Sequence, residues 1–149
     1  MYRTILVPVD GSKQAEAILD HVEKLGKIQS AKVVLLKVEE EPILLERDEV
    51  IDTARYRDEF EKRKKLSNAY LESLKARLRE KGVQADTRLA YGIVVKTILA
   101  AADEIGADLI AIATHGMGGS LRVSYGSVAA GVIQAANIPI LLVRTKSDK

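Results

Sequence analysis

The chain alternates between short, nearly continuous apolar runs and longer segments in which apolar residues recur every three or four positions. Continuous apolar runs of strand length predict strands that are buried on both faces, as in a parallel sheet covered by helices. Apolar residues at helical spacing predict amphipathic helices between these strands. The predicted strands are Thr4 to Val9, Lys32 to Val38, Gln84 to Ala90, Leu109 to Thr114 and Pro139 to Arg144. The alternation of strand and helix predicts βαβ units and an α/β fold.

A glycine or an asparagine stands between a helical segment and each strand after the first. These residues are Gly26, Gly82, Gly106 and Asn137. Glycine lacks a Cβ atom and asparagine tolerates the left-handed conformation in which many helices end. We therefore predict that each of the four ends a helix.

The segment from Asp48 to Glu80 is highly charged. Its polar middle, Arg57 to Lys65, is predicted to be a solvated helix face or a protruding turn. A functional basic patch at Arg63 to Lys65 is the alternative. The interleaved acids Glu59 and Glu61 favour the solvated face.

Composition narrows the class of protein. With 149 residues, 47% of them hydrophobic and 30% charged, the chain is expected to form a single globular domain over residues 1–149. It contains no cysteine, which excludes a disulfide framework, a thiolate nucleophile and a cysteine-ligated metal. We expect neither a metal site built by the protein alone nor a dedicated catalytic residue.

The charge balance and the hydropathy indicate which partners to expect. The chain has 23 basic and 21 acidic side chains and only 4% aromatic residues, without an obvious basic stripe, so no nucleic acid is expected to bind. No apolar stretch approaches the ~20 residues that span a bilayer, and no secretory signal is recognisable at the amino end. We therefore expect a cytoplasmic protein without a membrane partner.

Two loops that follow predicted strands carry candidate chemistry, because ligands bind at the carboxyl ends of strands in open α/β sheets. In the first loop, Asp10 could accept a hydrogen bond from a ribose hydroxyl or contact a phosphate-bound metal. The alternative is a structural role, in which its carboxylate stabilises the turn or the N-terminus of the following helix. Ser12 is predicted to cap the following helix.

The second loop, from Gly116 to Gly126, contains four glycines. Main-chain N–H groups without neighbouring side chains can approach an anion closely, and Gly126-Ser127 then begins a predicted helix whose N-terminus favours negative charge. This pattern predicts a phosphate site.

Better-known fingerprints do not match this loop. The chain has no Gly-Lys-Ser/Thr triplet of a Walker A loop, and the dinucleotide pattern fails at Leu121. A nucleophile elbow would need glycine where Arg122 stands. Of the two histidines, His21 borders an apolar helix face and is interpreted as structural, whereas His115 either donates to a phosphate or packs beside the strand end.

The motifs at both ends of the chain resemble those of the universal stress protein family. Thr114 to Gly116, nine intervening residues, Gly126 to Val128 and then Asn137 to Arg144 are similar to the family's carboxyl-terminal signature. Ile5 to Ser12 resembles its opening strand and loop. The resemblance extends over essentially the whole chain.

The resemblance implies a five-stranded parallel sheet of order 3-2-1-4-5 with helices on both faces, a Rossmann-like fold of the adenine nucleotide alpha hydrolase type. It also implies a site for ATP or another adenine nucleotide, together with Mg²⁺, between the ends of the first and fourth strands. The positions that match the family's site are Pro8, Val9 and Asp10 around adenine and ribose, Val38 against the base, the main chains of His115, Gly116, Gly126, Ser127 and Val128 on the phosphates, and Arg122 at a basic loop position.

The chain departs from the family pattern at Ala113, which occupies the place of the first loop glycine. A regulatory, stress-related nucleotide-binding module is the function that the resemblance implies, with slow ATP hydrolysis as the most activity expected. The alternative is an interaction protein with a vestigial pocket. The resemblance further implies a homodimer paired through the last strand, Ile138 to Val143, which fits the strand because a bare apolar edge would promote aggregation. The alternative is a strand that is covered within one chain.

Overall fold

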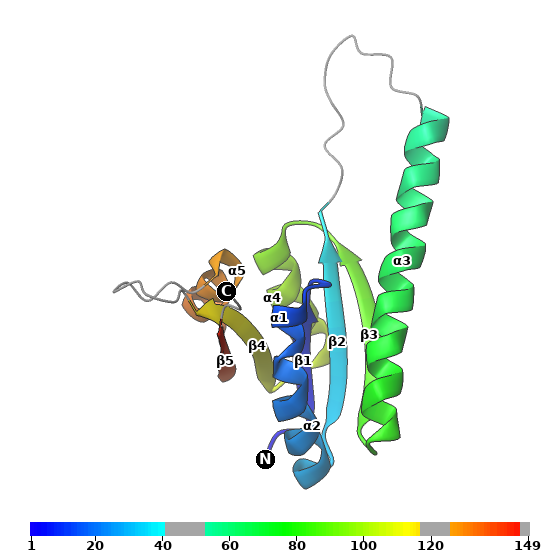
Figure 1. The fold of residues 1–149 in the computed structure, drawn as a ribbon. Helices are drawn as coiled ribbons and strands as arrows, with labels where there is room; N and C mark the ends of the chain where they lie inside the picture. Colours follow the sequence, from blue (N-terminus) through cyan, green and yellow to red (C-terminus); the bar gives the residue numbers. More distant parts are fainter. Residues whose placement is uncertain (41–52, 117–125, 147–149) are drawn as a thin grey trace.

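The computed structural model describes residues 1–40, 53–116 and 126–146. Five parallel strands form one sheet in the order β3-β2-β1-β4-β5, as the resemblance implied (Figure 1). The strands are β1 (Thr4–Val9), β2 (Lys32–Glu39), β3 (Gln84–Tyr91), β4 (Leu109–Gly116) and β5 (Ile140–Lys146). β4 and β5 run two residues further than their apolar runs, since His115 and Gly116 stay in register with Thr145 and Lys146.

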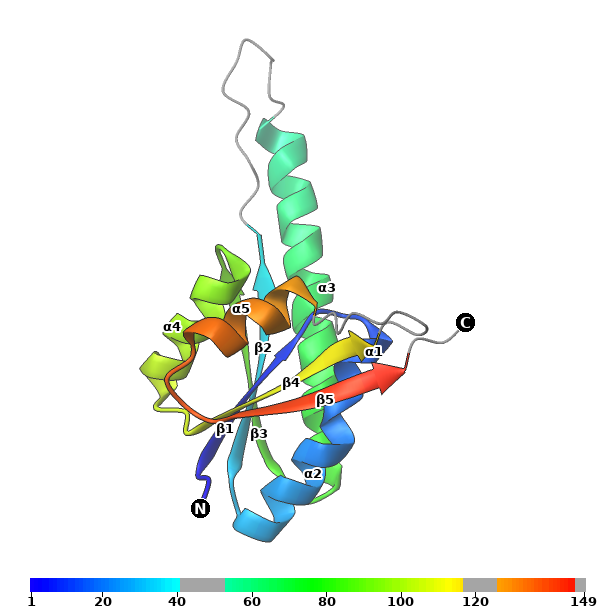
Figure 2. The same ribbon diagram turned by 90° about the vertical axis from the view of Figure 1, so that its left-hand side faces the viewer.

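Helices cover both faces of the sheet. They are α1 (Lys13–Glu16), α2 (Ile18–Gln29), α3 (Thr53–Glu80), α4 (Val94–Ile105) and α5 (Ser127–Ala135). Helices α1, α2 and α3 lie on one face, and α4 and α5 lie on the other, as the view toward the β5 edge shows (Figure 2).

The core is divided by the sheet into two apolar clusters. The first joins alternate strand residues such as Val7 and Leu35 to α2 and α3. The second joins the intervening strand residues, such as Leu6 and Leu36, to α4 and α5. This two-sided burial is why the strands read as continuous apolar runs.

Two of the four predicted helix ends are confirmed and two are wrong. Gly82 and Gly106 adopt φ of +84° and +67°. Gly26 instead lies inside α2, where an added Cβ would stand 2.8 Å from Val83 Cγ1, so its role is close packing. The left-handed residue that ends α2 is Ser30, with φ of +52°. Asn137 is also not left-handed, because α5 ends at Ala136 in an extended conformation.

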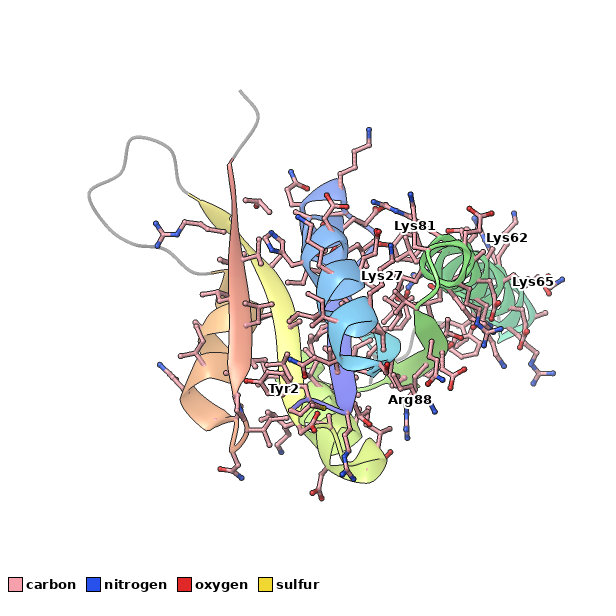
Figure 3. All side chains as sticks on the ribbon, turned by 90° about the horizontal axis from the view of Figure 1, so that it is seen from below. Tyr2, Lys27, Lys62, Lys65, Lys81 and Arg88 are labelled. Atoms are coloured by element: carbon pink, nitrogen blue, oxygen red, sulfur yellow. The ribbon has the colours of Figure 1, made fainter. Side chains whose placement is uncertain are left out.

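Helix α3 is longer than the sheet needs, and its first turns extend past the ends of β2 and β3 (Figure 1). Almost all residues from Arg57 to Lys65 are exposed, which confirms the predicted solvated face. Lys62 and Lys65 point away from the sheet (Figure 3). Within the three ranges described, no helix combines the length and the hydropathy needed to cross a bilayer.

Asp108 fixes the start of β1 next to β4. Its Oδ2 and Oδ1 accept hydrogen bonds from the N–H groups of Arg3 and Thr4 at 2.8 and 3.0 Å, and its own N–H donates to Thr4 O at 3.0 Å. Burial alone would raise the pKa of the Asp108 carboxyl, but the two N–H donors outweigh it and hold the pKa below its ordinary value.

We therefore expect Asp108→Asn to lower the melting temperature in a pH-dependent way. A depressed carboxyl pKa stabilises the fold above the unfolded-state pKa, and this contribution is lost as the pH falls through the folded-state pKa. Thermal unfolding of both proteins should differ most above about pH 5 and converge toward about pH 2. A difference that stays constant across this range would contradict the prediction.

Candidate functional site

The site lies where the chain leaves β1 and β4 toward opposite faces of the sheet. After β1 it passes to α1, and after β4 it passes to α5. β1 pairs with β4 at Ile5–Leu109 and Leu6–Ile110, whereas its pairing with β2 continues as far as Val9. The carboxyl ends of β1 and β4 therefore diverge and form the crevice in which open α/β sheets bind ligands.

The first turn of α5 is directed at this crevice. Gly126 is the N-cap of the helix, and its N–H donates to Thr114 Oγ1 at 2.8 Å. Gly126 O accepts from the N–H of Ala130 at 2.9 Å, which starts the helical ladder. The N–H groups of Ser127 and Val128 are at the first two helical positions and have no partner within the helix. N–H groups in this position, together with the helix dipole, favour the binding of an anion.

A cavity of about 460 Å³ adjoins the start of α5. Its volume is in the range of small-ligand pockets. Its lining is formed by Glu40, Gly92, Ile93, Val94, Val95, Ser127 and Val128. Val38, at the end of β2, packs into the same apolar cluster as Val94, Val95 and Val128. An apolar group bound here would lie beside the first turn of α5.

The loop from Asp10 to Ser12, called the Asp10 loop below, forms a tight polar turn on the other side of the crevice. Asp10 Oδ1 accepts from the Ser12 N–H at 2.9 Å and from Ser12 Oγ at 2.5 Å. Ser12 Oγ accepts from the N–H of Ala15 at 3.1 Å, which confirms Ser12 as the cap of α1. The turn role of Asp10 is thus present, and both of its hydrogen bonds use the same oxygen.

The sequence profile of the universal stress protein family matches residues 1–144. The chain belongs to this family. It is 31% identical over 159 residues to universal stress protein MJ0577 of Methanocaldococcus jannaschii, covering 99% of this chain and 98% of the relative. It is 34% identical to universal stress protein YxiE of Bacillus subtilis, covering 97% of this chain and all of the relative.

Solved structures of other universal stress proteins superpose on this one over nearly its whole length. The structure of MJ0577 superposes with a TM-score of 0.79 at 30% identity and covers 99% of both chains. A universal stress protein in complex with cAMP (TM-score 0.66, 22% identity, 97% and 98% of the two chains) shares the fold. So does one from Archaeoglobus fulgidus in complex with dAMP (TM-score 0.62, 23% identity, 95% and 98%).

The predicted site residues of this universal stress protein lie at the carboxyl edge of β1, β2 and β4, but on two faces. Val38, Ser127 and Val128 are on the α4 and α5 face. Pro8 follows Leu6 on that face by strand alternation. The side chains of Val9 and Ala113 pack into the opposite cluster, beneath α2. Val9 therefore offers only its main chain to a ligand in the crevice.

The remaining predicted site residues are Gly126, the residues at the end of β4 and Arg122. Because the Gly126 N–H donates to Thr114 Oγ1, the next N–H groups at the start of the helix are those of Ser127 and Val128. His115 and Gly116 close β4 opposite Thr145 and Lys146, and the His115 side chain lies outside the described part of the chain. Arg122 lies outside the described residues as well. His21 is exposed on α2, so its interpretation as a residue bordering the core is not supported by its burial.

A polar cluster beneath the Asp10 loop was not identified from the sequence. Lys37 Nζ contacts Glu39 Oε1 and Ser67 Oγ, the latter at 2.9 Å, and Ser67 Oγ donates to Glu39 at 2.7 Å. Burial opposes ionisation of Glu39, but its hydrogen bonds to Lys37 and Ser67 lower its pKa. Ser67 is 4% exposed and falls at a helical position otherwise occupied by leucines, which is the signal that could have revealed it.

Tyr70 of α3 lies near the same loop. Its buried hydroxyl makes no hydrogen bond to the described residues, and burial together with the nearby Glu16 and Asp10 carboxylates raises the pKa of Tyr70 to about 12. Lys37 is also close, since its Cε lies 3.9 Å from where a Cβ on Gly11 would be. Side chains of β2 and α3 thus lie next to the Asp10 loop.

Proposed function

We propose that this universal stress protein binds an adenine nucleotide in the crevice between β1 and β4 and acts as a dimeric regulatory module. The observation that carries the proposal is the first turn of α5, where Ser127 and Val128 begin the helix and line a cavity together with Glu40 and the residues from Gly92 to Val95. The N–H groups of a first helical turn have no partner within the helix. Relatives of the same fold bind cAMP and dAMP, which supports an adenine nucleotide as the ligand.

Each group of residues has a defined role in this proposal. Val38 and Pro8 provide apolar surface for the base, and the main chain near Val9 provides hydrogen-bonding groups. Asp10 Oδ2 is the oxygen left for a ribose hydroxyl, since Ser12 uses Oδ1. The N–H groups at the start of α5 receive the phosphates.

The residues also suit a Mg²⁺ ion that accompanies the phosphates. Mg²⁺ is commonly held by one or two carboxylates together with substrate phosphates and water. Two carboxylates lie at this end of the sheet among the described residues: Asp10, whose Oδ2 would hold either the ribose hydroxyl or the ion, and Glu40, which lines the cavity at the start of α5. The ion would neutralise phosphate charge and thereby strengthen the binding of ATP more than that of AMP.

Calorimetric titration with ATP, AMP and cAMP, with and without Mg²⁺, tests the proposal. Guanosine nucleotides serve as controls for the base. Saturable binding of at least one adenine nucleotide is expected, with thermal stabilisation of about 2.7 kcal/mol at a ligand concentration of 100 times Kd. Absence of both heat and stabilisation at millimolar ligand would leave the interaction protein with a vestigial pocket as the function.

The methyl group of Ala113 is not expected to obstruct the nucleotide, because it packs into the cluster beneath α2 and away from the α5 face. Ala113→Gly should therefore leave the nucleotide Kd within about threefold, a change of less than about 0.7 kcal/mol. The same variant should lose about 1 kcal/mol of unfolding free energy, since glycine is costly within a strand. A gain of tenfold or more in affinity would show that the methyl group does narrow the site.

Dimerisation through β5 is the second part of the proposal. β5 is an edge strand, and its apolar residues Leu141 and Val143 are only half-buried. A cavity of about 580 Å³ separates Val143 from α1 and α2, so this face is incompletely covered within one chain. Pairing with a second copy would cover it and remove the exposed edge.

Sedimentation equilibrium tests this pairing. The wild type is expected to be a dimer, and Val143→Lys should shift it toward the monomer, because a desolvated ammonium group opposes pairing. Ile28→Lys is the matched control, since Ile28 is 81% exposed on α2. A monomeric wild type, or equal behaviour of the two variants, would contradict pairing through β5.

A further inference from the structure

In the described part of the chain, three residues have buried polar side chains, and one of them bonds the main chain of another beside the crevice. The three are Ser67, Thr114 and Thr145, exposed by 4%, 4% and 8%. Thr145 Oγ1 donates to Thr114 O at 2.9 Å. Thr114 Oγ1 accepts from the Gly126 N–H at 2.8 Å. A continuous series of hydrogen bonds therefore joins β5, β4 and the N-cap of α5.

These bonds connect segments that are distant in the sequence. Thr114 and Gly126 are separated by 12 positions, and Thr114 and Thr145 by 31. A buried hydroxyl without a partner is costly, so each threonine is held in the orientation in which it is bonded. The N-cap of α5 carries no side chain that could fix it, because it is glycine. Thr114 supplies the anchor that the N-cap residue itself lacks.

We propose that Thr114 and Thr145 are positioning residues for the anion-binding turn of α5. Thr114 fixes Gly126, and so sets the direction in which the Ser127 and Val128 N–H groups face the crevice. Thr145 fixes the main chain of Thr114 from the edge strand. Neither hydroxyl needs to touch the ligand. The inference deepens the proposed function and depends on it for its ligand, but the anchoring itself can be measured without any nucleotide.

The first measurement is amide hydrogen exchange of Gly126 in the ligand-free wild type. The Gly126 N–H is expected to be protected by at least about tenfold relative to an unstructured amide, because it is bonded to a buried acceptor. An unprotected Gly126 amide would overturn the anchoring, whatever the nucleotide result.

Variants then separate anchoring from general stability. Thr114→Val keeps the branched shape and removes the acceptor, so we expect faster exchange at Gly126 and an AMP Kd about 3- to 10-fold higher. Thr114→Ser keeps the hydroxyl and should restore both values to within about twofold. Thr87→Val, the same substitution on the far edge strand β3, should change neither value.

If Thr114→Val does not fold, Thr145→Val provides an independent test. It leaves the Thr114 hydroxyl in place and removes the bond to Thr114 O, so a smaller loss of Gly126 protection and of AMP affinity is expected. Unchanged affinity in a folded Thr114→Val, or failure of Thr114→Ser to restore it, would overturn the proposal. If the wild type binds no nucleotide while Thr114→Val still loses Gly126 protection, the proposed function fails and the anchor stands.

Discussion

Replacing Leu71 by alanine is expected to lower the free energy of unfolding by about 2–5 kcal/mol. Leu71 is 1% exposed and belongs to the apolar cluster that joins α3 to the sheet, together with Leu74 and Leu78. Truncation would remove buried contacts and leave a cavity that a strand and a long helix can fill only in part. The loss should appear as a lower midpoint in urea unfolding followed by circular dichroism.

Leu66→Ala is the matched control, because Leu66 is 70% exposed on the same helix. Its substitution should change the unfolding free energy by no more than about 0.5 kcal/mol. A similar loss in both variants would mean that α3 does not pack as described. The pair therefore tests the docking of the helix that carries Ser67 and Tyr70.

Replacing Ser127 by proline is expected to weaken nucleotide binding by about 10- to 100-fold while the fold is kept. Proline has no N–H, so one donor to the phosphates is removed, and a hydrogen bond to a charged group is worth about 1.5–3 kcal/mol. The helix should tolerate the change because proline is favoured at the first helical position. Gly126 precedes it with φ of −52° and ψ of 153°, a conformation that a following proline allows.

Ser127→Ala separates the main-chain donor from the side-chain hydroxyl. It keeps the N–H group and should retain an affinity within about threefold of the wild type. Calorimetry of the three proteins with AMP gives the comparison, and their melting temperatures should be similar. Equal losses in the two variants would show that the hydroxyl, not the N–H group, receives the phosphate.

The fold was largely predictable because strands that are buried on both faces of the sheet appear in the sequence as continuous apolar runs. Each predicted strand is present, and the strand order follows from the family resemblance. The errors arise where tertiary contacts outweigh local preference. Gly26 reads as a helix end, but Val83 packs against it and the helix continues to Gln29. β4 and β5 continue through polar residues because main-chain pairing does not depend on hydropathy.

The elements around the candidate site could be predicted from the sequence, whereas the contacts within it could not. Strand alternation alone indicates that Ala113 shares a face with Leu109 and Ala111, so the position of its methyl group could have been anticipated. The bond from Gly126 to Thr114 could not, because it depends on where α5 begins relative to the sheet. The cluster of Lys37, Glu39 and Ser67 likewise requires the packing of α3 on β2.

The central claim is that an adenine nucleotide binds at the start of α5. It is tested most directly by titrating the ¹⁵N-labelled protein with AMP and following each main-chain amide by NMR. We predict saturable chemical-shift changes at Ser127, Val128 and Asp10. Little change is expected at Gly82 and Gly106, which precede β3 and β4 at the amino ends of the strands. No saturable shift, or shifts confined to the amino ends of the strands, would contradict the claim.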